Sequence, residues 1–151
     1  MKILLYSLIL FLLSFCKGGL SESQKSEIVK IFQEHQKIQE TLVANPKSLP
    51  EIKSLIESLR SGSKSLQGTK AESLIKSSLE IAEKTNLSSE ESYFDSLSKI
   101  AENLGTVMKE TEVASYHLFY CPMLNKYWVA KGETLVNPYA PDMRDCGEMV
   151  K

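Results

Sequence analysis

The sequence lacks an excess of charge of either sign. Its 151 residues include 18 Lys and Arg and 19 Asp and Glu, which gives a formal net charge of −1. These charges are interspersed, so the chain has no basic face of the kind that binds phosphate backbones. A content of 42% hydrophobic and 25% charged residues is typical of one globular domain with a sizeable core. We therefore predict a single domain that does not bind nucleic acid.

Motifs of catalysis are also missing. The sequence contains no GXSXG elbow, no glycine-rich phosphate loop and no HEXXH pair. Acidic pairs such as Glu90-Glu91 lie at expected helix starts or on exposed faces, where the helix dipole and solvation explain them. His117 and Cys121 could form a nucleophile pair, but no residue nearby provides an oxyanion hole. We expect that the protein is not an enzyme.

Long hydrophobic runs are absent beyond the N-terminus. The run from Ile3 to Leu13 is shorter than the roughly 20 residues that span a bilayer, and it suits the apolar region of a secretory signal. It leads into LSFCKGG, which resembles a bacterial lipobox with Cys16 as the lipidated residue. The alternative is a plain signal peptide that is cleaved nearby, with Cys16 discarded.

These features predict a signal peptide with lipobox over residues 1–16 and a small polar tether over 17–23. The protein would be exported, as a periplasmic or outer-membrane lipoprotein. It would contact a membrane through its lipid anchor only.

Apolar residues recur at helical spacing along four segments, which predict a mainly α fold. The first helix spans about Glu22 to Ala44, and His35 lies on its apolar stripe as a satisfied core or boundary residue. We expect an antiparallel four-helix bundle over residues 24–113, followed by a loop-and-short-strand cap over residues 114–151 in the same domain.

Capping patterns predict the bounds of the other three helices. Serine or threonine three residues before glutamate opens a helix, and a Ser-Gly-Ser run ends one. The second helix is expected to begin at Ser48-Leu49-Pro50-Glu51 and to end near Arg60, before Ser61-Gly62-Ser63. The third and fourth are expected to begin at Thr69 with Glu72 and at Ser88 with Glu91.

The cap should contain three short strands, at residues 116–120, 127–130 and 134–136, because aromatic and β-branched residues become frequent after Glu112 and Pro and Gly appear at short intervals. Turns are expected at Lys131-Gly132 and Asn137-Pro138. Trp128 is predicted to act as the hydrophobic plug that joins the cap to the helices.

The cap also gathers side chains that bind soft metals. Imidazole, thiolate and thioether groups are supplied by His117, Cys121, Met123, Met143 and Cys146. Thiolates and thioethers select soft ions, so copper(I) or silver(I) would be the first candidates and zinc the next. Two simpler interpretations stay open: Cys121 and Cys146 could form a structural disulfide, as exported cysteines often do, and the methionines could pack against aromatic rings.

Several of these residues resemble a family signature. Cys121-Pro122-Met123, Trp128, Asn137-Pro138-Tyr139, Met143 and Cys146-Gly147 are similar to the motif of an uncharacterised bacterial domain. That domain occurs in small exported proteins and in periplasmic adaptor subunits of copper and silver efflux systems. The resemblance implies a helical bundle before the motif, metal handling, and an efflux adaptor as partner.

Two functions are therefore predicted from the sequence. In the first, a lipid-anchored exported protein binds copper(I) or silver(I) through Cys121, Met123, Met143 and Cys146, with His117 as a further ligand. It would sequester the ion or pass it to a heavy-metal efflux system. In the second, a metal-free lipoprotein carries a cap locked by a Cys121–Cys146 disulfide, which docks a partner through Tyr127, Trp128 and Tyr139.

Overall fold

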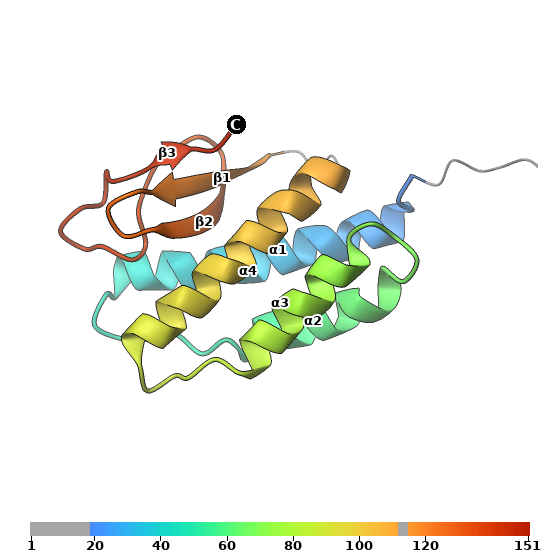
Figure 1. Cartoon of the computed structure of the whole chain (residues 1–151), viewed down its shortest axis with the longest axis horizontal. Coiled ribbons are helices and arrows are strands. Elements are labelled where there is room, and N and C mark those ends of the chain that lie inside the picture. Colours follow the sequence, from blue (N-terminus) through green and yellow to red (C-terminus); the bar gives the residue numbers. More distant parts are fainter. Residues whose placement is uncertain (1–18, 112–114) are drawn as a thin grey trace, which may run out of the picture.

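The computed structural model describes residues 19–111 and 115–151, and it contains four helices followed by three strands. The helices are α1 (Glu22–Ala44), α2 (Lys53–Ser65), α3 (Glu72–Glu83) and α4 (Glu90–Thr111), and the strands are β1 (Tyr116–Cys121), β2 (Lys126–Lys131) and β3 (Glu148–Met149) (Figure 1). The predicted mainly helical fold with a small C-terminal sheet is confirmed. The predicted signal peptide, Cys16 and the start of the tether lie outside the described residues.

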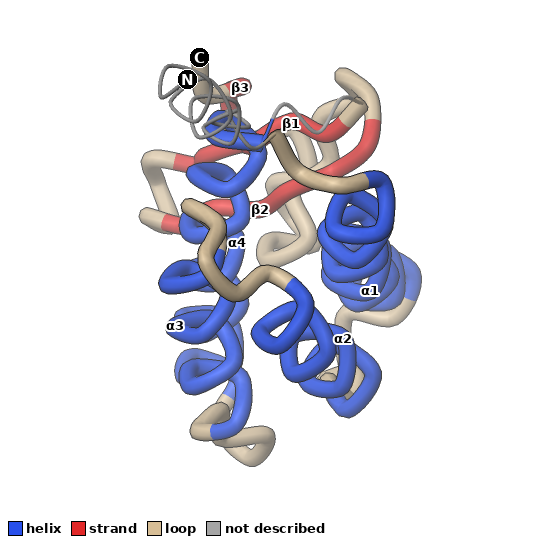
Figure 2. The backbone as a smooth tube through the Cα atoms, turned by 90° about the vertical axis from the view of Figure 1, so that its right-hand side faces the viewer, coloured by secondary structure: helices blue, strands red, loops and turns tan. Residues whose placement is uncertain are grey.

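The helices pack in the order of the chain, and the sheet takes the place of a fourth helix-helix contact. Each helix lies against the next, but α1 and α4 make few contacts with each other, and β2 packs against both. Figures 1 and 2 show the sheet on one side of α1 and α4, with α2 and α3 on the other side. A closed antiparallel four-helix bundle is thus not confirmed. No helix among the described residues is long and apolar enough to cross a membrane.

Helix α1 has the predicted bounds because its start is encoded locally. The side chains of Ser21 and Gln24 cap each other's backbone N–H groups, which forms a capping box. His35 is fully buried on this helix, as predicted, and its Nε2 lies 3.3 Å from the carbonyl oxygen of Leu97. Burial lowers the pKa of His35 from 6.5 to about 4, and the hydrogen bond to Leu97 opposes this only in part. The ring is therefore neutral in the folded protein at pH 7.

Helix α2 differs from the prediction at both ends. It begins at Lys53, without a side-chain cap, and it continues through Gly62 to Ser65. A Cβ atom at Gly62 would lie 2.6 Å from Cδ1 of Ile31, so the glycine lets α2 approach α1 closely. Gly62 was predicted to end α2, but it is a packing residue inside that helix.

The starts of α3 and α4 also deviate from the predicted caps. Thr69 donates its hydroxyl proton to the carbonyl of Leu66 and does not cap α3, although Glu72 is still the first residue of that helix. At α4 the hydroxyl of Ser89 accepts the N–H of Ser92 at 3.3 Å. The capping residue is therefore one position later than the predicted Ser88.

The sheet is antiparallel, in the order β2-β1-β3, and its two faces have different neighbours. Leu118 pairs with Val129, and the next pair along the strands is Phe119 with Trp128. Because side chains alternate along a strand, these two pairs point to opposite faces. Leu118 lies over Gly105 of α4, so Phe119 and Trp128 lie on the outer face.

Trp128 therefore belongs to the interior of the cap and is not the predicted plug between cap and helices. Its ring stacks on Phe119, with centroids 5.6 Å apart, and meets the ring of Tyr139 edge-on at 6.4 Å. The ring contacts that join cap and helices are Tyr139 with Phe94 at 5.1 Å and Tyr116 with Phe32 at 5.0 Å. The prediction failed because strand periodicity alone does not say which face of a sheet meets the helices.

The predicted third strand at residues 134–136 is wrong. This segment pairs with no strand among the described residues and belongs to the loop that follows β2. The third strand is β3, which pairs Met149 with Phe119. A Cβ atom at Gly147 would lie 2.5 Å from the ring of Trp128 and 3.4 Å from Leu135. The loop that joins β2 to β3, residues 132–147, thus covers the outer face of the sheet and is called the covering loop below. It carries two of the predicted site residues, Met143 and Cys146.

Candidate functional site

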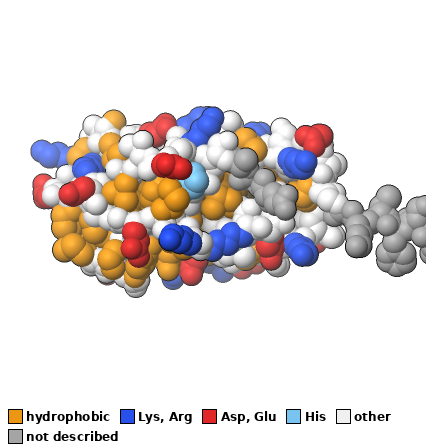
Figure 3. All heavy atoms as spheres, turned by 90° about the horizontal axis from the view of Figure 1, so that it is seen from above, with side chains coloured by type: hydrophobic (Ala, Val, Ile, Leu, Met, Phe, Trp, Pro, Cys, Tyr) orange, Lys and Arg blue, Asp and Glu red, His pale blue; other side chains and the backbone are white. Residues whose placement is uncertain are grey.

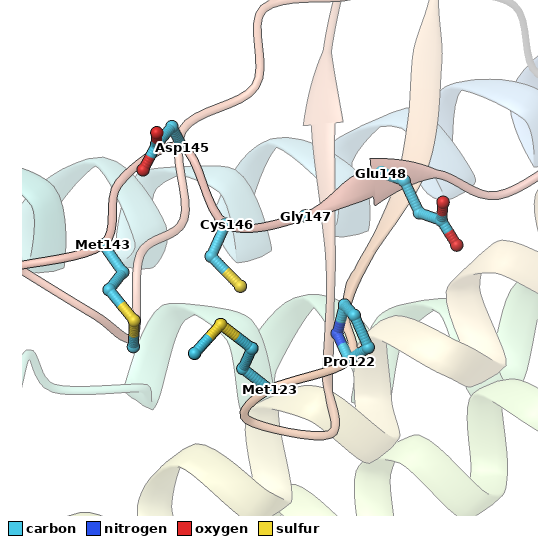
Figure 4. A pocket seen from close by; sticks show the side chains of 7 residues that line it. All are labelled: Pro122, Met123, Met143, Asp145, Cys146, Gly147 and Glu148. Atoms are coloured by element: carbon cyan, nitrogen blue, oxygen red, sulfur yellow. The ribbon is translucent and has the colours of Figure 1, made fainter.

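Three sulfur-bearing side chains of the cap meet at a pocket of about 350 Å³ at one end of the sheet. It is lined by Pro122, Met123, Met143, Asp145, Cys146, Gly147 and Glu148 (Figure 4). Met123 comes from the turn between β1 and β2, whereas Met143 and Cys146 come from the covering loop between β2 and β3. Figure 4 shows the side chains of all three directed toward the same space.

A disulfide joins Cys121 to Cys146 beneath this pocket. The two Cα atoms are 5.6 Å apart, so the bond ties the end of β1 to the covering loop. Cys121 is fully buried, whereas Cys146 is only partly buried. Of the two states that the sequence left open for these cysteines, this structure contains the disulfide.

Asn137 holds the covering loop in place. It is fully buried, and its backbone N–H donates to the carbonyl of Arg144 at 2.8 Å while its Nδ2 donates to the carbonyl of Cys146 at 3.0 Å. Its Oδ1 accepts the N–H of Tyr139, which makes an Asx turn. Sequence reasoning identified only this turn. The bonds that bring Met143 and Cys146 to the pocket depend on residues seven and nine positions away.

Arg144 anchors the same loop to the helices, and sequence reasoning missed it. Its guanidinium donates to the carbonyl of Asn137 at 2.6 Å and to the carbonyls of Leu42 and Val43 at 3.4 and 3.3 Å. The latter two lie in the last turn of α1, which has no basic residue of its own. A cation is favoured there because it neutralises the negative end of the helix dipole.

His117 lies apart from the predicted ligands. It precedes Cys121 by four residues in β1, and a rise of about 3.3 Å per residue separates their Cα atoms by roughly 13 Å. Its ring centroid is 6.5 Å from that of Phe119, and it does not line the pocket. The structure therefore brings together Met123, Met143 and Cys146, with Cys121 behind them, and leaves His117 outside.

Met123 is not a packing residue. Its relative exposure is 72%, far above that of a methionine packed against aromatic rings. An exposed thioether beside a second thioether is a pair of soft donors, and the Cys146 sulfur next to them would become a third if the disulfide were reduced. Among the described residues, no group of three or more His, Cys, Asp or Glu side chains is arranged to hold a metal ion, so any site here would depend on the methionines.

The charged residues that line the pocket are both acidic. Asp145 and Glu148 line it and are exposed, and within the described part of the chain no lysine or arginine lines it. Two carboxylates in the lining favour a cation at the pocket over an anion.

Comparisons with known proteins add no relative: no family model, no curated protein and no solved structure matches this chain. The resemblance to the bacterial domain of efflux adaptors stays a prediction.

Proposed function

We propose that this protein binds a soft monovalent metal ion, copper(I) or silver(I), in the pocket at the end of the sheet. The observation that carries the proposal is the convergence of three sulfur-bearing side chains, Met123, Met143 and Cys146, from separate parts of the chain. Thioether and thiolate sulfur are the donors that select such ions. The acidic rim of the pocket would favour entry of a cation.

The donor set fits the ion best in the reduced protein. In the disulfide form, Met123 and Met143 are the sulfur donors that remain free, and two thioethers bind weakly. Reduction would release the thiolates of Cys121 and Cys146, which are the stronger ligands for copper(I). Zinc fits less well, because its sites use imidazole, thiolate and carboxylate rather than thioether, and His117 lies outside the pocket.

We further propose that the protein is exported and anchored through Cys16, and that it sequesters the ion or passes it to a heavy-metal efflux adaptor. The signal-like N-terminus and the resemblance to the adaptor domain support this role. The helices, as an antiparallel bundle, would act as a scaffold for the cap and would perform no catalysis.

Anaerobic titration with copper(I) against a coloured competing chelator tests the proposal. The reduced wild type should take up one ion. A Cys121→Ser/Cys146→Ser variant and a Met123→Leu/Met143→Leu variant should both compete more weakly. Met149→Leu is the matched control, because Met149 lies in the same cap but outside the pocket. If the reduced wild type does not compete with the chelator, the proposed function is wrong.

A second candidate is a metal-free interaction module locked by the disulfide. It is favoured by the exposure of Met123 and Met149, at 72% and 37%, and by the hydrophobic side chains that gather on the sheet side of the molecule in Figure 3. The predicted contact residues need correction, since Trp128 and Tyr139 are 1% and 6% exposed and offer no surface. A free-thiol count on protein from its native compartment separates the candidates, and two blocked thiols would favour this one.

A further inference from the structure

We infer that the Cys121–Cys146 disulfide is a thiol-exchange site with a fixed direction, in which an incoming thiolate attacks Sγ of Cys146 and Cys121 is the leaving group. The inference deepens the proposed function and rests on it for its purpose, because exchange would produce the reduced pair that binds the metal. The chemistry itself requires no metal.

The direction follows from the different burial of the two sulfur atoms. Cys121 is 0% exposed, at the end of β1 and beneath the covering loop. Cys146 lines the open pocket, and in Figure 4 its sulfur points into the space beside the Met123 side chain. Thiol-disulfide exchange requires a thiolate to reach the sulfur that it attacks. Cys146 offers that access, and Cys121 does not.

The exchange balances with external thiols as the reductant. The thiolate forms a bond to Sγ of Cys146 while the Cys146–Cys121 bond breaks, and Cys121 leaves as a thiolate that takes a proton from water. A second external thiolate then attacks the sulfur of the first external thiol. This step releases Cys146 as a thiolate and gives an external disulfide. Two external thiols are oxidised, and the two cysteines of this protein are reduced.

The charges at the pocket indicate which thiols react fastest. The attacker is an anion, and among the described residues the pocket lining includes two acids, Asp145 and Glu148, and no basic residue. In Figure 4 both carboxylates lie at the edge of the pocket and point away from Sγ of Cys146, so they act on the attacker through their charge and not by contact. A thiol that carries additional negative charge is repelled further, whereas a thiol on a cationic molecule is attracted. The partner that this pocket fits is therefore a thiol set in a positively charged surface.

The test uses the oxidised protein and two small thiols of opposite charge, cysteamine and glutathione. Each is added at the same thiolate concentration, the reaction is quenched with acid, and peptide mass spectrometry locates the mixed disulfide. We expect it on Cys146. We also expect cysteamine to react about three- to tenfold faster than glutathione at low salt, with a smaller ratio at high salt.

An Asp145→Asn/Glu148→Gln variant should lower the ratio of the two rates toward one. Glu133→Gln is the matched control, because Glu133 is an exposed acid of the cap that does not line the pocket. A mixed disulfide on Cys121, or equal amounts on both cysteines, would overturn the inferred direction. Equal ratios in the wild type and the double variant would overturn the role of the two acids. Neither result depends on metal, so failure here is distinguishable from failure of the copper titration.

Discussion

The docking of the sheet on α4 depends on one close contact that mutation can probe. Gly105 lies in the middle of α4, and an added Cβ atom would be 2.6 Å from Cδ2 and 3.1 Å from Cδ1 of Leu118. Carbon atoms in favourable contact are about 3.5 to 4.0 Å apart, so an alanine would come roughly 1 Å too close. Leu118 is 5% exposed and lies in the core, which limits the room into which its side chain can move.

Two opposing effects set the expected change in stability of Gly105→Ala. Alanine favours a helix interior over glycine by about 1 kcal/mol, while overpacking in a core costs about 1 to 3 kcal/mol. The net result should be neutral or a loss of up to roughly 2 kcal/mol, and not the gain that an uncrowded helix would show. Leu118→Ala should cost about 2 to 5 kcal/mol. In the double variant the clash is absent and the new methyl group fills part of the cavity.

Urea unfolding measures this cycle, with Trp128 fluorescence reporting on the cap and far-ultraviolet circular dichroism on the helices. Trp128 is the single tryptophan of the chain. The double variant should be more stable than the sum of the single effects by about 1 kcal/mol or more. A stabilising Gly105→Ala substitution together with additive effects in the double variant would refute the described contact between β1 and α4.

Two further predictions concern His35 and the disulfide. The pKa of His35 is about 4 when folded and 6.5 when unfolded, so its contribution to stability is present above pH 6.5 and is lost as the pH falls toward 4. At about 1.4 kcal/mol for each unit of pKa, the loss of stability is roughly 3 kcal/mol. In a His35→Gln variant, the free energy of unfolding should depend less steeply on pH between pH 4 and pH 6.5. Reduction of the disulfide opens a loop of 25 residues and should lower the free energy of unfolding by about 3 kcal/mol, measured by urea titration with and without a phosphine reductant. Equal midpoints in the two titrations would contradict that estimate.

The sequence identified the soft donors of the cap, but it could not decide which of the five lies apart from the others. Residue chemistry identified Cys121, Met123, Met143 and Cys146, and the structure places the last three at one pocket with Cys121 behind it. His117 has the same chemical suitability, yet its place in β1 puts it away from the others. Arg144 could not be identified, because its partners in α1 lie about a hundred positions earlier in the chain.

The sequence by itself determined the elements whose hydrogen bonds are local. Helix α1 has its capping box within four residues, and the strands β1 and β2 coincide with two short segments rich in aromatic and β-branched residues. Hydrogen bonds over three or four residues depend on nearby side chains, so a local pattern is sufficient to predict them.

Only the tertiary structure decided the roles of residues whose packing partners lie in distant segments of the chain. Gly62 continues α2 because Ile31 of another helix approaches it, and residues 134–136 cover the sheet because Asn137 binds residues further along the chain. Likewise, Trp128 points away from the helices because Leu118 and Val129 occupy the inner face of the sheet. In each case the deciding partner is remote in sequence, and packing rather than local propensity selects the outcome.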